Sequence, residues 1–256
     1  MSAQRVAWAI ALRTWRNTFR RPVVLAFSFV QPLIWMTFFG FLFQRYPLEL
    51  FDPGISYTTF LAPGVAAMTV LFGASQAGIL YVRDYQSGFL TRMLGTPAGA
   101  GAQLAGKVGA DVVRLLVQAV VVLGLGLVVG ARFAPSAFAL VTAFVGLALF
   151  GVAFGAISCS VALLAKAPES MGTFVHIVNM PMLFTSTALV PARQMPDWLQ
   201  GVVANNPLTL TVNGLRGALL FGTVPRPEAV IALVGLAGIL FWLAAALLRR
   251  AERTAA

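Results

Sequence analysis

The stretch Tyr81–Lys107, YVRDYQSGFLTRMLGTPAGAGAQLAGK, separates two long apolar blocks and is too polar to join either of them. It carries the charged residues Arg83, Asp84, Arg92 and Lys107. Charged side chains are costly in the hydrocarbon core of a bilayer. We therefore expect this stretch to form a loop in water or at a headgroup surface, while the blocks on either side lie in lipid.

The whole chain is far more apolar than a soluble domain of its length needs to be. Of its 256 residues, 59% are hydrophobic and 10% are charged, and the mean hydropathy is +0.86. A bilayer core of about 30 Å is crossed by roughly 20 apolar residues in a helix, and the blocks show no period-2 alternation typical of a barrel. The predicted fold is a single all-α integral membrane domain, 1–256, with six transmembrane helices. The predicted spans are Val23–Phe43, Thr58–Leu80, Val108–Gly130, Ala137–Leu164 and Met171–Val190, all within 23–190, and Glu228–Leu248.

The distribution of basic residues predicts the orientation of the chain. Of the 18 lysines and arginines, twelve lie in the N-terminal segment, in the stretch after the second span, at Lys166 and in the C-terminal tail. Five lie on the opposite side, and Arg114 lies within the third span. Because basic residues favour cytoplasmic loops, both termini are predicted to be cytoplasmic.

Composition also limits the partners. The net charge of +10 is compatible with nucleic-acid binding, but the cations are scattered over several loops. Topology and anionic lipid headgroups account for them better, so we expect the lipid bilayer, and no nucleic acid, as a partner. Cys159 is the single cysteine, which excludes a disulfide scaffold and a cysteine metal site. We expect no metal ligands in the chain, and no cleavable signal peptide.

The segment 1–22 is predicted to be an amphipathic helix at the membrane interface. Trp8, Leu12, Trp15 and Phe19 fall on one face of a helical wheel, with arginines beside them. Such an apolar face lies in the membrane surface while the arginines reach the headgroups. An unstructured basic tail is the alternative.

A second region of short helices is predicted in 191–227, between the fifth and sixth spans. Pro196 can open one helix. Asn206 and Pro207 can cap and start another, which Gly222 would end. This second helix has an apolar stripe, so we expect it to dip into the outer leaflet as a re-entrant helix; an ordinary surface helix is the alternative.

Polar and aromatic residues inside the predicted spans are candidates for a transport pathway. Two interpretations stay open for them, namely contact with a substrate and hydrogen bonding between helices. The candidates are Gln31, Trp35, Phe38, Thr69, Gln76 and Asn179. Asp111 and Arg114, near the start of the third span, are predicted to form an ion pair along the helix instead of a proton relay.

The sequence lacks the motifs of an enzyme. Gly101–Lys107 reads GAQLAGK and matches the opening of a phosphate-binding loop, but Val108 stands where the magnesium-binding Ser or Thr is required. The hydrolase motif G-x-S-x-G and the zinc-protease motif H-E-x-x-H are both absent, and there is one histidine. We therefore expect no catalytic residue and no cofactor bound by this chain.

The whole chain resembles a known family, and two groups of residues carry the resemblance. The first is the outer signature Met195-Pro196-x-Trp198-Leu199, then Asn206-Pro207-Leu208 and Leu215-Arg216-Gly217. The second is Arg83-Asp84-x-x-x-Gly88-Phe89-x-x-x-Met93-Leu94-x-x-Pro97 in the stretch after the second span. Both are similar to motifs of the membrane subunits of ABC-2 type ATP-binding-cassette exporters, of the daunorubicin-resistance and nodulation-export permease kind.

The resemblance implies a mechanism and a set of partners. Two copies of the chain, or one copy and a close paralogue, would form a pathway in a bacterial plasma membrane, and two ATPase subunits would supply ATP and magnesium. The stretch Arg83–Leu94 would be the helix that couples the chain to the ATPase. The residues implied in this contact are Arg83, Asp84, Gly88, Phe89, Leu90, Arg92, Met93 and Leu94.

The function implied is export of an amphipathic drug, a lipid-like molecule or a glycan. A secondary transporter or channel driven by a gradient is the alternative, which would need ionisable groups in the membrane or an inverted repeat. A membrane-embedded enzyme would need a paired nucleophile and base or a metal cluster.

Overall fold

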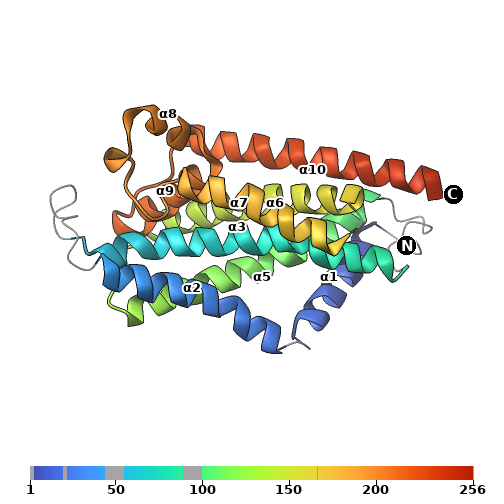
Figure 1. Ribbon diagram of the computed structural model, residues 1–256, viewed down its shortest axis with the longest axis horizontal. Coiled ribbons are helices and arrows are strands. Elements are labelled where there is room, and N and C mark those ends of the chain that lie inside the picture. Colours follow the sequence, from blue (N-terminus) through green and yellow to red (C-terminus); the bar gives the residue numbers. More distant parts are fainter. Residues whose placement is uncertain (1–2, 20–21, 44–54, 89–99, 166, 256) are drawn as a thin grey trace.

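The computed structural model describes residues 3–19, 22–43, 55–88, 100–165 and 167–255, and these form helices joined by turns, with no β-strand among them. The helices are α1 (Ala3–Phe19), α2 (Pro22–Leu42), α3 (Tyr57–Gln86), α5 (Ala100–Val128), α6 (Ala137–Ala165), α7 (Pro168–Phe184), the 3₁₀-helix Ala192–Gln194, α8 (Asp197–Asn205), α9 (Pro207–Leu220) and α10 (Pro227–Ala255). The long helices lie along one another in an elongated bundle, with both chain termini at one end (Figure 1). We call this end the terminal end, and the opposite end, where α8 and α9 lie, the distal end.

Four helices are long and apolar enough to cross a membrane: Tyr57–Gln86 in α3, Gly101–Val128 in α5, Ala137–Ala165 in α6 and Pro227–Arg250 in α10. They correspond to the second, third, fourth and sixth predicted spans. Residues Phe29–Leu42 of α2 form a shorter apolar helix, and α7 has 17 residues. The prediction of an all-α, multi-pass membrane protein is confirmed.

Two helices extend beyond their apolar blocks. α3 continues to Gln86 and α5 begins at Ala100, so both ends of the stretch 81–107, predicted to be a loop, are helical. Gly88, with a φ of 66°, follows α3 in the left-handed conformation that favours glycine. The apolar pattern marks the part of a helix that suits lipid, but a helix continues into polar sequence when its charged side chains reach water, as Arg83 does, or form an ion pair, as Lys107 does.

After α7 the chain turns back into the bundle. The sequence predicts that the fifth span runs to Val190, but α7 ends at Phe184. The turn residues Ser186–Leu189, which we call the inserted segment, are all buried. Gly64 of α3 makes room for them, because a Cβ at this position would collide with the carbonyl oxygen of Ala188. The inserted segment therefore packs directly on the backbone of α3.

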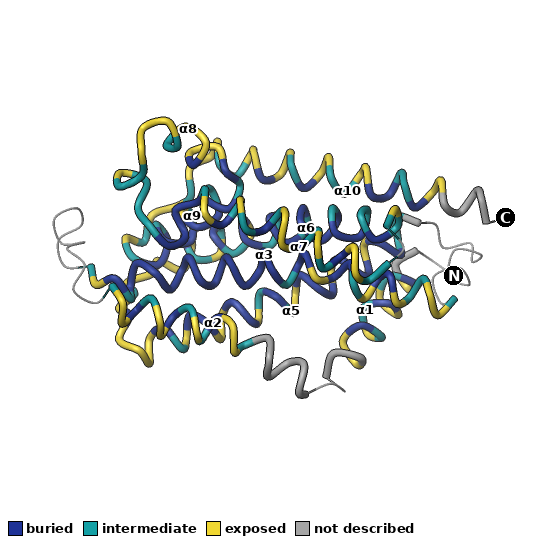
Figure 2. Tube along the Cα trace, viewed as in Figure 1, coloured by how far each residue is buried: buried dark blue, intermediate teal, exposed yellow. Residues whose placement is uncertain are grey.

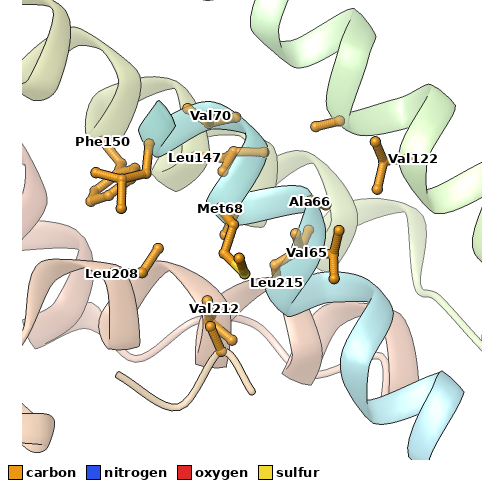
Figure 3. Packing of buried hydrophobic residues seen from close by; sticks show 14 of the residues in the cluster. Val65, Ala66, Met68, Val70, Val122, Leu147, Phe150, Leu208, Val212 and Leu215 are labelled. Carbon is orange, nitrogen blue, oxygen red and sulfur yellow. The ribbon is translucent and has the colours of Figure 1, made fainter. Parts of the chain in front are cut away.

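α3 lies at the centre of the bundle. It contacts α2, α5, α6, α7 and α9, and most of its length is buried (Figure 2). Figure 3 shows how α3 residues meet side chains from α5, α6 and α9; the labelled residues are Val65, Ala66, Met68, Val70, Val122, Leu147, Phe150, Leu208, Val212 and Leu215. Outer helices expose apolar side chains such as Val117 and Ile231, as expected for a surface that faces lipid.

Candidate functional site

The first candidate region, at the terminal end, joins α1 to the last turn of α3. Two nitrogens of the Arg13 guanidinium donate to the two carboxylate oxygens of Asp84, at 2.9 and 3.3 Å. This is the paired geometry that gives Arg–carboxylate bonds their directional specificity. Both side chains are partly exposed, so the pair is worth little as a surface ion pair. Its main consequence is geometric: it fixes the direction of α1 relative to the end of α3.

α1 also packs on α5. Val6 and Ile10 are buried, a Cβ at Gly106 of α5 would collide with the backbone of Ala7, and Trp15 Nε1 donates to the carbonyl oxygen of Ala110 at 3.3 Å. α1 is therefore a packed helix, and the alternative of an unstructured tail does not hold.

The predicted apolar face of α1 is largely open. Trp8 is 67% exposed, and Leu12 and Trp15 are each 40% exposed. An exposed row of this kind, with arginines beside it, suits the membrane interface.

A buried ion pair lies next to this contact on α5. Lys107 Nζ donates to Asp111 Oδ2 at 2.7 Å, and both side chains are almost completely buried. The predicted pairing of Asp111 with Arg114 is present at a longer distance, 3.9 Å from Arg114 Nε to Asp111 Oδ1. Lys107 was missed as a partner because the sequence assigns it to a loop, although its i, i+4 spacing from Asp111 is a helical signal.

The sequence that resembles a phosphate-binding loop is part of helix α5. Gly101–Lys107 forms the first turns of α5, and its lysine is bonded to Asp111. In a phosphate-binding motif the residues before the lysine form a loop that follows a strand, whereas here they are helical.

The structure describes part of the predicted coupling stretch. Arg83 is exposed at the end of α3, Asp84 bonds to Arg13, and Gly88 follows α3 with a φ of 66°. The remaining predicted coupling residues lie outside the described residues; they are Phe89, Leu90, Arg92, Met93 and Leu94.

A second polar cluster lies inside the bundle where α3, α6 and α7 meet. Ser75 Oγ donates to Asn179 Oδ1 at 2.8 Å, and Asn179 is fully buried. Ser158 Oγ donates to the carbonyl oxygen of Ser75 and accepts the N–H of Gly78 at 2.9 Å. Hydrogen bonding between helices, one of the two interpretations left open for Asn179, is therefore observed. Ser75 and Ser158 were missed because a single serine in an apolar helix gives no signal of its own.

The other candidates for the transport pathway differ in their burial and in their contacts. Thr69 is buried and donates to the carbonyl oxygen of Val65 in its own helix. Gln31 and Phe38 are exposed on α2, and Gln76 is exposed on α3. Trp35 is half-buried and stacks on Phe39, with 5.0 Å between ring centroids. Two of the six candidates, Thr69 and Asn179, are thus buried, and three lie on the outer surface of the chain; Trp35 is intermediate.

A third polar region, at the distal end, is built around Arg216 of α9. Arg216 Nε and Nη2 both donate to the carbonyl oxygen of Phe60, at 3.3 and 3.1 Å. Nη2 also donates to the carbonyl oxygen of Thr187 at 3.0 Å, and Nη1 donates to Asn213 Oδ1 at 3.4 Å. The guanidinium carbon lies 3.6 Å from the centre of the Phe60 ring, within cation–π range. One buried side chain thus joins α9, α3 and the inserted segment.

Further hydrogen bonds hold the inserted segment. The Thr187 hydroxyl donates to Asn213 Oδ1 at 2.9 Å, and the Thr187 N–H donates to Thr209 Oγ1 at 3.2 Å. The Tyr57 hydroxyl donates to the carbonyl oxygen of Leu189 at 3.0 Å. Buried backbone groups in a nonhelical segment need such partners, and residues of α3 and α9 supply them.

Asn206 caps two helices at once. Its Oδ1 accepts the N–H of Leu208 at the start of α9 at 2.8 Å. Its Nδ2 donates to the carbonyl oxygens of Met182 and Thr185, each at 2.8 Å. The predicted N-cap at Asn206, with Pro207 in the first turn, is confirmed. Its bonds to the end of α7 also satisfy carbonyl groups that have no partner within that helix.

The other residues of the outer signature differ in how far they are buried. Met195 and Pro196 precede α8, and Trp198 is 76% exposed. Leu215 is fully buried, while Gly217 accepts the N–H groups of Phe221 and Thr223 at the end of α9. Gly222 has a φ of 61° and follows α9, where the sequence places the end of the helix.

The apolar stripe of α9 is covered by the protein itself. The stripe suggested a helix that dips into lipid, but its residues are buried and belong to the core around α3 (Figure 3). These residues are Leu208, Val212, Leu215 and Leu219.

Comparison with known proteins agrees with this architecture. Residues 5–220 match the family described as ABC-2 type transporter. The chain is 32% identical to a protein of Pyropia yezoensis named as a transport permease, ycf38, over 81% of this chain and 72% of that protein. It is 30% identical to a daunorubicin resistance ABC transporter permease of Streptomyces coeruleorubidus, over 79% and 70% of the two chains. It is 27% identical to nodulation protein J of Neorhizobium galegae, over 77% and 75%. The chain therefore belongs to the ABC-2 type transporter family.

Proposed function

We propose that this chain is the membrane subunit of an ATP-binding-cassette exporter, energised by a separate ATPase subunit that binds ATP and magnesium. Two copies of the chain, or one copy and a close paralogue, form the transport unit with two ATPase subunits at the terminal end. The observation that carries this proposal is the match of residues 5–220 to the ABC-2 type transporter family. The paired bond between Arg13 and Asp84 adds a link between α1 and the start of the predicted coupling stretch.

The topology that we propose has six membrane passes, made by α2, α3, α5, α6, α7 and α10. These helices run alternately toward the distal end and toward the terminal end (Figure 1). The terminal end then faces the cytoplasm of a bacterium, in agreement with the basic residues near the termini. α8 and α9 form the outer helices before the last pass.

Movement passes from the ATPase to the membrane through three contacts. The stretch Arg83–Leu94 binds the ATPase, and closure of the ATPase pair on ATP displaces it. Asp84 transmits this displacement to α1 through Arg13. α1 then moves with α5, because Ala7 lies against Gly106 and the Trp15 indole is bonded to Ala110. Packed helices that shift as rigid units are a common basis for such transitions.

The substrate class that we favour is an amphipathic drug, with a lipid-like molecule or a glycan as the other classes. A similar protein is named for daunorubicin resistance. The exposed positions of Gln31, Phe38 and Gln76 support a pathway formed between two copies of the chain. Thr69 and Asn179 then have a packing role.

Transport in inside-out vesicles tests this function. The vesicles contain the chain and the ATPase that co-purifies with it, and daunorubicin is the probe. We expect the drug to accumulate when ATP is added, and not with a hydrolysis-deficient ATPase. Accumulation driven by an imposed ion gradient without ATP would instead support the secondary transporter.

Reversal of one charge tests the route through α1. Arg13→Glu places two carboxylates together, and we expect ATP-driven transport to fall about fivefold, the scale of one partly exposed ion pair. Arg16→Glu, at an exposed position on the same helix, is the matched control and should change transport little. The double variant Arg13→Glu with Asp84→Arg should recover most of the activity. Equal loss in the Arg13 and Arg16 variants would mean that positive charge on α1, and not this bond, is what transport requires.

A further inference from the structure

A cavity of about 340 Å³ lies at the distal end, apart from the residues assigned to coupling, to the pathway or to the outer signature. Its size falls in the range of small-molecule sites, roughly 300–1,000 Å³. The start of α3, the turn after α5 and the end of α9 form its walls. Its lining residues are Ile55, Ser56, Thr59, Gly130, Arg132, Leu220 and Phe221.

Arg132 is the charged residue of the cavity. No carboxylate lines the cavity with it, and the ion pairs among the described residues involve other side chains. An arginine guanidinium has a planar set of donors that matches the oxygens of a phosphate group. The charge of the cavity therefore favours an anion with phosphate chemistry.

The backbone of Arg132, whose side chain is exposed, is held by the turn in which it lies. Gly130 has a φ of 102°, which favours glycine, and Ala131 N–H returns to the carbonyl oxygen of Gly126 at 2.8 Å. The Arg132 N–H then donates to Thr59 Oγ1 at 3.0 Å. The Thr59 and Ser56 hydroxyl oxygens lie 2.9 Å apart, so a hydroxyl pair lies beside the arginine in the same wall.

The remaining wall is apolar and continues onto the outer surface. Ile55, Leu220 and Phe221 line the cavity, and Phe221 is 56% exposed. A molecule with a phosphate at Arg132 would thus find apolar surface next to its headgroup.

We propose that this cavity binds the phosphate of a phospholipid from the leaflet at the distal end, with Arg132 as the phosphate ligand and Phe221 against the start of an acyl chain. A cation and a hydroxyl pair beside an apolar wall match the two parts of such a lipid. The proposal does not depend on the exporter function, because it concerns binding at the opposite end from the ATPase contact.

Native mass spectrometry of the delipidated full chain tests the site, with dioleoyl-phosphatidylglycerol as the probe. We expect one lipid to bind per chain more tightly than any other, and Arg132→Gln to weaken this binding about tenfold, the effect of losing a charge-assisted hydrogen bond. Arg226→Gln is the matched control, because Arg226 is also exposed near the distal end but does not line the cavity. It should bind the lipid within about twofold of the unmodified chain, since exposed headgroup contacts are weak.

Equal lipid binding by the unmodified chain and Arg132→Gln would overturn the proposal, as would equal weakening in the Arg132 and Arg226 variants. Two further probes identify the source of the phosphate. Dioleoylglycerol, which lacks the phosphate, should bind at least about tenfold more weakly, and equal binding would contradict a role for Arg132. Millimolar inorganic phosphate should leave the lipid bound; displacement of the lipid would mean that free phosphate is the ligand and that the lipid assignment is wrong.

Discussion

Arg216→Leu is expected to lower the free energy of unfolding by about 3–5 kcal/mol, because several hydrogen bonds from a charged donor are lost together. The carbonyl oxygen of Thr187 would lose the guanidinium, and the Phe60 ring would lose its cation. The inserted segment would then be held by fewer bonds in a place where water cannot replace them. Thermal unfolding in detergent should show a melting temperature lower by about 10 °C.

Two variants and a second measurement sharpen this test. Arg216→Lys keeps the charge but cannot reach Phe60 and Thr187 with one planar group, so its loss should be intermediate. Arg193→Leu, at an exposed position before α8, should change stability by less than about 0.5 kcal/mol. Hydrogen exchange should rise first in Ser186–Leu189. An unchanged melting temperature in Arg216→Leu would show that these bonds do not stabilise the distal end.

Phe89→Asp is expected to reduce ATP-driven transport by at least about tenfold while the chain still folds and inserts, because a carboxylate would enter an apolar contact with the ATPase. The sequence places Phe89 with Leu90 and Leu94 in the coupling stretch after α3. Arg83 and Asp84, just before this stretch, lie at the terminal end of α3. The measurements are daunorubicin accumulation in vesicles and the amount of ATPase retained on the tagged chain.

The control for this variant lies at the opposite end. Trp198 is also a large exposed aromatic residue, 76% exposed at the start of α8. Trp198→Ala should leave the ATPase associated. Full transport by Phe89→Asp would refute the coupling role, and loss of the ATPase in Trp198→Ala would show that the assignment of the two ends is wrong.

The short helices of the distal end were predictable because their signals are local. A capping asparagine followed by proline starts α9, and a glycine in the left-handed conformation follows its end. The limits of the long helices were less predictable. The apolar pattern reports the part of a helix that suits lipid, whereas α3 continues through Arg83 and Asp84 to Gln86.

The partners of the polar residues could not be predicted in the same way. Arg216 belongs to the outer signature, but its contact with Phe60 joins residues 156 positions apart. This contact forms because α9 packs on α3, and the bond from Arg216 to Thr187 forms because the chain turns back into the bundle after α7. The bond between Ser75 and Asn179 depends likewise on the packing of α7. Spacing along the chain predicts contacts within one helix, such as Asp111 with Arg114, but it does not predict which residues of two helices lie opposite each other.

The central claim is that a separate ATPase drives this chain from the terminal end. The most direct test is purification of the tagged chain from its native membranes in a gentle detergent, followed by intact-mass measurement of the complex. We expect one ATP-binding-cassette ATPase for each copy of the chain, in an assembly with two of each. A chain that purifies alone, under conditions that preserve such complexes, would contradict the proposal and favour a carrier or channel driven by a gradient.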